Sequence, residues 1–133
     1  MELLGNNRLE AQEYADRMLK AHQYADFYEA LRGWILVRLQ LECDEAEEDL
    51  LSLCAFSIKR IAAGNAGIHE LVDKYDCHQT SVMVRKKVLL IMALEKLMGI
   101  RFDDDTAHEL DTVTLLAQAA FVEYRGKEVK QHV

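Results

Sequence analysis

Reactive side chains gather between residues 76 and 81, where a polar run reads Asp-Cys-His-Gln-Thr-Ser. Cys77 and His78 could form a thiol nucleophile with its base, and Asp76 could orient that base. Catalytic cysteine and histidine are normally distant in sequence and meet through the fold, because neighbours along the chain rarely point at each other. We therefore interpret this run as loop composition rather than a triad, and we predict that the chain is not an enzyme.

Residues of the types that bind metal ions are present, but they are not spaced along the sequence as the paired ligands of a metal site are. Cys77, His78, His69 and His108 include no pair such as Cys-x-x-Cys. Residues 103–105 are three consecutive aspartates, whose hard oxygens suit a divalent cation, but they do not follow the Asp-x-Asp-x-Asp-Gly loop pattern. The simpler interpretation is a solvated connector that favours the start of the following helix, so we predict no metal site.

Two hydroxyls, Thr80 and Ser81, close the polar run. Either side chain could accept a hydrogen bond from an orphan backbone N–H, and serine and threonine are preferred helix N-caps for this reason. The helix that they would cap is predicted to reach Met98, because Gly99 can adopt the left-handed conformation that ends a helix. An N-cap is the simpler interpretation of Ser81, and covalent attachment of a group is the alternative.

The elements that must position these residues are predicted to be helices. Proline is absent and glycine occurs only six times in 133 residues, which favours an all-α fold. Apolar residues recur at spacings of three and four. This spacing predicts helices over about residues 7–22 and 24–43, or one bent helix over both ranges. Further helices are predicted over 44–63, with Asp44 as the N-cap, over 68–75 and over 80–98. A single helical turn at 106–110 then leads to a last helix that begins at Asp111 or Thr112 and frays after Tyr124. The run 88–94 is apolar on every side, so the helix containing it should be the most enclosed.

Composition excludes several functions. The formal net charge of −7 disfavours nucleic-acid binding, which needs a cationic surface. The longest apolar run, residues 88–94, is far too short to span a bilayer, and residues 1–9 lack the apolar core of a signal peptide. Cys43, Cys54 and Cys77 form no disulfide framework. Cytoplasmic residence with reduced thiols is expected, with Cys43 and Cys54 as core residues.

Residues 89–124 read LLIMALEKLMGIRFDDDTAHELDTVTLLAQAAFVEY, and this segment resembles the second half of an acyl carrier protein. Residues 90–95 look like the core of that family's second helix and Gly99-Ile100 like its turn. Residues 103–110 look like the acidic connector and short third helix, and 111–113 like the start of the fourth. The resemblance extends back to about residue 44. It implies a four-helix carrier-like bundle over 44–125, an N-terminal helical extension over 1–43 and a polar tail over 126–133.

The resemblance also implies a function. In that family a serine at the start of the second helix bears phosphopantetheine, whose thiol presents acyl groups to the enzymes that transfer them. Without a gap the serine position falls on Val84, and the family's Asp-Ser-Leu triplet is missing. An insertion of about one helical turn would bring Ser81 into the role. Ser81 is thus the predicted attachment point for phosphopantetheine, in an atypical carrier.

A basic cluster departs from the family pattern. The carrier's recognition helix is acidic and meets basic patches on its enzymes, whereas Arg85, Lys86 and Lys87 make this helix start basic. Like charges would penalise standard carrier partners, so these three residues are predicted to bind a different protein or an anionic ligand. The alternative function is a degenerate carrier-fold module for protein–protein interaction without a prosthetic group. An exposed face of the extension could also close a homodimer.

Overall fold

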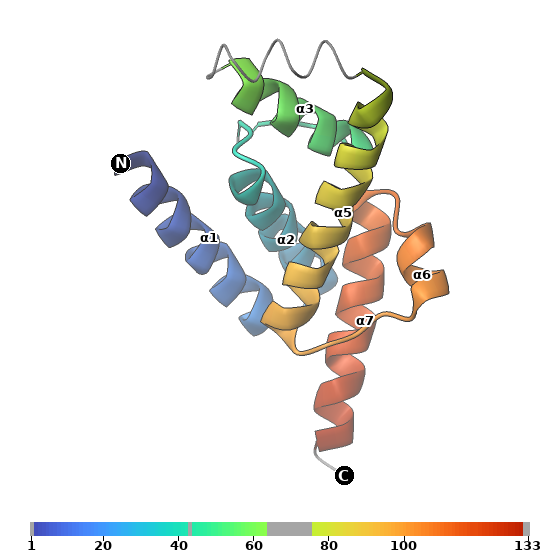
Figure 1. The fold of residues 1–133 in the computed structure, drawn as a ribbon. Coiled ribbons are helices and arrows are strands. Elements are labelled where there is room, and N and C mark those ends of the chain that lie inside the picture. The colour runs from blue at the N-terminus through green and yellow to red at the C-terminus, as the bar shows by residue number, and fades with distance from the viewer. Residues whose placement is uncertain (1, 43, 64–75, 132–133) are drawn as a thin grey trace.

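The fold is a bundle of helices (Figure 1). The computed structural model describes the backbone of residues 2–42, 44–63 and 76–131, and the side chains of residues 9–42, 44–60 and 82–126. Within these ranges there are six helices and no strand, which confirms the predicted all-α class. They are α1 (Glu2–Lys20), α2 (Tyr24–Arg38), α3 (Leu50–Ala63), α5 (Asp76–Met98), α6 (Asp104–Glu109) and α7 (Val113–Gln131). The helix predicted over 68–75 lies outside the described residues.

Helices α1 and α2 form a hairpin, with α1 at the left of the view and α2 in the middle of the bundle, behind α5 (Figure 1). Residues 21–23 are not helical, so the two predicted helices are separate and the single bent helix is wrong. Gly33 of α2 sits directly against the ring of Tyr14 of α1, and a Cβ atom at position 33 would overlap that ring. The close approach of the two helices therefore depends on glycine at this position.

A methyl group at position 33 should loosen the hairpin. Alanine is a better helix former than glycine by roughly 1 kcal/mol, yet in Gly33→Ala the overlap with Tyr14 should outweigh that gain. We expect Gly33→Ala to lower the free energy of unfolding, measured by urea denaturation. Adding Tyr14→Ala should recover stability relative to Gly33→Ala alone. If the double variant is less stable than Gly33→Ala, the overlap is not the cause.

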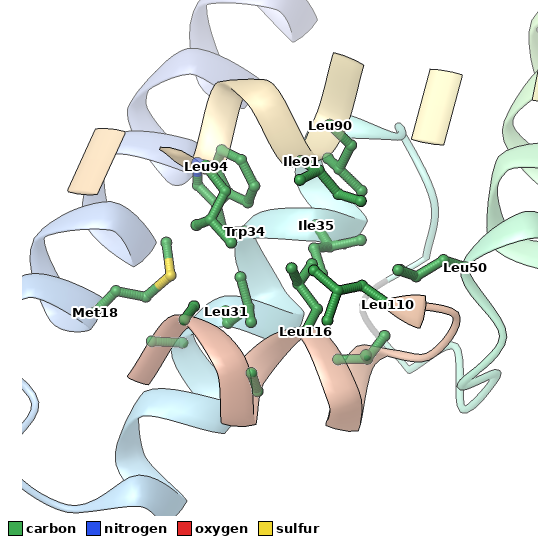
Figure 2. Close-up of a cluster of buried hydrophobic side chains, with 14 of the residues drawn as sticks. Met18, Leu31, Trp34, Ile35, Leu50, Leu90, Ile91, Leu94, Leu110 and Leu116 are labelled. Atoms are coloured by element: carbon green, nitrogen blue, oxygen red, sulfur yellow. The ribbon is translucent and has the colours of Figure 1, made fainter. Parts of the chain in front are cut away.

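One hydrophobic core joins the N-terminal hairpin to the rest of the chain (Figure 2). Leu31, Trp34 and Ile35 of α2 are buried, and they belong to the same cluster as Leu94 of α5 and Leu116 of α7. The predicted boundary between residues 43 and 44 stays a prediction, but the core is continuous across it. Helix α7 contributes Val113, Leu116, Ala117 and Ala120 to this core, and all four are fully buried.

The predicted start of the third helix at Asp44 is wrong. Helix α3 begins at Leu50, and Asp49 is its N-cap, because the Asp49 carboxylate accepts a hydrogen bond from the Ser52 N–H at 2.9 Å. Residues 44–49 are held in a non-helical connector by Arg32. Its guanidinium donates to the backbone carbonyls of Glu45 at 2.6 Å and Glu47 at 2.8 Å. These carbonyls are therefore bound to a side chain of α2 instead of to helical N–H groups.

Helix α5 begins earlier than predicted. Its first residue is Asp76, so Thr80 and Ser81 lie inside the helix and the interpretation of either as its N-cap is wrong. Its end is confirmed: Gly99 has a φ of 66° and the Ile100 N–H bonds back to the Glu95 carbonyl at 3.0 Å. This long helix carries most of the residues that the sequence singled out.

The last helix starts where it was predicted to. The Thr112 hydroxyl accepts a hydrogen bond from the Leu115 N–H at 3.1 Å, so Thr112 is the N-cap of α7. The helix continues to Gln131, beyond Tyr124, and fraying of its last turns stays a prediction.

Candidate binding groove between α5 and α6

Helix α5 presents apolar side chains on two opposite faces. Leu90, Leu94 and Met98 point into the core and are almost fully buried. On the outward side, Val84, Val88, Leu89 and Met92 are 44%, 46%, 57% and 55% exposed. The prediction that this helix is the most enclosed is therefore wrong: among the described residues its second apolar face has no covering element.

A groove of about 800 Å³ runs beside this outward face. One wall is α5, with Val84, Val88 and Met92, and the other is the 100–102 connector together with α6. Ile91 and Phe102, both largely buried, contribute to its lining. The lining of the groove is mostly apolar, and its charged side chains are those of Lys87, Glu95, Lys96, Arg101 and Asp104.

Two hydrogen bonds fix the wall opposite α5. The Phe102 N–H donates to the Glu95 carboxylate at 2.8 Å, which ties the connector to α5. The Asp103 carboxylate accepts from the Thr106 N–H at 2.7 Å and caps α6, and these bonds to Thr106 lower the pKa of Asp103. The prediction that the aspartates favour the start of the next helix is confirmed at Asp103.

The three predicted partner-binding cations lie in different environments. Arg85 is exposed and Lys86 is half-buried. Lys87 is 8% exposed, and its ammonium pairs with the Asp111 carboxylate at 2.9 Å, joining α5 to the start of α7. Lys87 therefore stabilises the fold. Lys87 precedes the buried Ile91 and Leu94 by four and seven residues, a spacing that places all three on one side of the helix. This spacing indicates that Lys87 points inward, but the two adjacent basic residues made it look like part of an exposed cluster.

The predicted attachment residue lies in the second turn of α5. Ser81 comes five residues after Asp76, and the side chains of Ser81, Cys77 and His78 lie outside the described residues. Val84, where the resemblance places the carrier serine, is half-exposed on the outward face. The structure therefore brings Val84 and Arg85 to the surface near the groove, and leaves the orientation of Ser81 undescribed.

Of the remaining candidate ligands, His69 and the side chains of Cys77 and His78 lie outside the described residues. In the described part of the chain, no group of three His, Cys, Asp or Glu side chains is placed to hold a metal ion. Cys54 is fully buried, as predicted, and burial raises the pKa of its thiol to about 11 despite the nearby Lys86 and Lys87. The Cys54 thiol is consequently protonated at neutral pH and is a poor nucleophile.

A polar cluster that sequence reasoning missed centres on Glu48. One oxygen of the Glu48 carboxylate accepts hydrogen bonds from the Thr114 N–H at 2.9 Å and from the Thr114 hydroxyl at 2.6 Å. The other oxygen accepts hydrogen bonds from the Arg32 guanidinium at 2.8 Å and from the Tyr28 hydroxyl. The partners lie 16 to 66 residues away, so no local pattern reveals them. The cluster joins α2, the 44–49 connector and α7.

Glu48 should make stability depend on pH. Burial alone would raise the pKa of Glu48, but the bonds from Thr114 and Tyr28 and the charge of Arg32 lower it below its ordinary value of 4.5. Folding thus favours the ionised carboxylate. This stabilisation is complete above pH 4.5 and is lost as the pH falls through the lowered pKa.

The variant that tests this role is Glu48→Gln. It should lower the free energy of unfolding at pH 7 by roughly 1–2 kcal/mol, less than for a fully buried carboxylate because the Glu48 side chain is partly exposed. Chemical denaturation between pH 7 and pH 3 should show a smaller loss of stability for Glu48→Gln than for the wild type. Parallel pH curves for Glu48→Gln and the wild type would exclude this role for Glu48.

Comparison with known proteins yields no counterpart: no family model, no curated protein and no solved structure matches the chain. Among the described helices, none is both long and apolar enough to cross a membrane.

Proposed function

We propose that this chain is a carrier-like helical bundle that acts as a protein-interaction module without a prosthetic group, and that it binds its partner through the outward face of α5. The observation that carries the proposal is the exposure of Val84, Val88, Leu89 and Met92 on a helix whose other face is in the core. Contiguous exposed apolar side chains commonly mark interaction surfaces, whereas a solitary one needs no explanation.

The order of the helices supports the carrier-like scaffold. Helices α3, α5, α6 and α7 follow the order in which the resemblance places the four carrier helices, and α6 has the predicted short length. The capped start of α6 at Asp103 and the glycine end of α5 lie in two of the segments on which the resemblance is based.

The absence of a hydroxyl at position 84 favours the module over the carrier. Valine cannot form the phosphodiester through which phosphopantetheine is attached. Ser81 lies one turn into α5, whereas the family's serine stands at the start of its helix. A carrier that used Ser81 would attach its arm to a position with a different local geometry.

An acyl carrier that uses Ser81 is the second candidate. The groove favours it, because an apolar channel of about 800 Å³ beside α5 has room for an alkyl chain. Ser81 precedes Val88 by seven residues, which is about two helical turns along α5. In this case the chain would present a phosphopantetheine-bound acyl group to acyl-transferring enzymes.

An intact mass separates the two candidates. The protein is incubated with coenzyme A and several promiscuous phosphopantetheinyl transferases, with an authentic acyl carrier protein in the same tube as positive control. We expect no mass gain on this chain while the control is converted. A gain of one phosphopantetheine that Ser81→Ala abolishes and Thr80→Ala does not would overturn the proposal in favour of the carrier.

A further inference from the structure

We infer that the groove between α5 and α6 accepts an amphipathic helix with acidic side chains, supplied by a different protein. The inference rests on the proposed function and specifies the chemistry of the partner.

The charge of α5 is opposite to that of the whole chain. Helix α5 contains four cationic and two acidic residues, although the chain has a net charge of −7. Among the exposed residues between 82 and 98, Arg85 and Lys96 are charged and none is acidic. Neither cation forms an ion pair with another described residue. The Glu95 carboxylate is bound to the Phe102 N–H.

The shape of the groove suits a helix. Val84, Val88 and Met92 repeat every four residues and form one ridge, and the groove beside them has Ile91 and Phe102 in its lining. An amphipathic helix docks in such a groove through apolar residues at spacings of three and four. The polar flank of the docked helix would then lie near Arg85 and Lys96. These two cations attract carboxylates on that flank and repel ammonium groups.

Two other occupants fit less well. If two copies of α5 packed face to face, antiparallel, Arg85 of one would approach Lys96 of the other, so like charges oppose this dimer. An anionic membrane is a flat surface, and it would not reach the apolar side chains at the bottom of the groove.

Three peptides of one design test the inference. Each is a fluorescein-labelled amphipathic helix of about 18 residues with an identical leucine face, and the polar positions are Glu, Gln or Lys. Anisotropy titrations should show the Glu peptide binding about tenfold more tightly than the Gln peptide, and the Lys peptide most weakly. The net charge of −7 would produce the opposite order, so this result can come only from local cations.

Charge reversal supplies the matched variants. Arg85→Glu/Lys96→Glu should abolish the preference for the Glu peptide, while Lys20→Glu/Lys59→Glu, with the same change in net charge on exposed positions of α1 and α3, should keep it. Equal binding of the three peptides, tightest binding of the Lys peptide, or no binding would overturn the inference. Displacement of the Glu peptide by phosphatidylserine vesicles, or by a second copy of the chain detected by sedimentation, would also overturn the inference. None of these outcomes alters the mass measurement above, so the two proposals fail separately.

Discussion

A chain that starts at residue 44 should not fold cooperatively. Helix α2 supplies Phe27, Leu31, Trp34 and Ile35 to the core, each almost fully buried. Burying one such side chain contributes about 1.5–3 kcal/mol. A domain of this size is usually stable by only about 5–15 kcal/mol, so the loss of α2 should remove most or all of that stability. We expect the 44–133 fragment to show no sigmoidal thermal transition by circular dichroism and to bind a hydrophobic dye.

The point variant Trp34→Ala provides a graded control. It should lower the free energy of unfolding of the full chain by about 3–5 kcal/mol, because it leaves a cavity where α2 meets the shared core. A cooperative melt of the 44–133 fragment would show instead that the N-terminal hairpin is a separable extension.

Val88→Asp should abolish binding at the groove without unfolding the protein. Val88 is half-exposed, in the middle of the ridge that lines the groove, so a carboxylate there costs little in the unbound chain. We expect the free energy of unfolding to change by no more than about 0.5 kcal/mol. In a complex the carboxylate would be buried among apolar groups, so affinity for the Glu peptide should fall by at least about a hundredfold.

The matched control is Val122→Asp. Val122 is 68% exposed on α7 and does not line the groove, so the same substitution there should leave both stability and binding unchanged. Equal losses of affinity in the two variants would mean that the added negative charge, rather than the α5 ridge, weakens binding. A Val88→Asp protein that binds as well as the wild type would exclude the groove as the contact site.

Local signals predicted the parts of the fold that depend on short stretches of chain. Scarce helix breakers indicated an all-α protein, Gly99 ended α5, and Thr112 capped α7. Contacts between distant residues caused the main error at a boundary. Arg32 holds the carbonyls of 45 and 47, so an acidic run typical of a first helical turn became a connector.

The candidate site was only partly predictable. The apolar run 88–94 showed that α5 was hydrophobic all round, but periodicity cannot say which of two apolar faces meets a neighbouring helix. The chain buries Leu90 and Leu94 and leaves Val88 and Met92 in solvent. Among the three adjacent cations, the internal pairing of Lys87 depends on Asp111, 24 residues away. The sequence located the relevant helix, and the fold determined which of its residues face the groove.

Site-directed photo-crosslinking in a lysate of the source cells shows whether the outward face of α5 is the contact surface. A photoreactive phenylalanine derivative is placed at position 88, at position 92 and, as a control, at position 122. We expect positions 88 and 92 to give one shared adduct with a second protein, which disappears when the Glu peptide is added, and position 122 to give no such adduct. Adducts of equal yield from all three positions, or from position 122 alone, would contradict it.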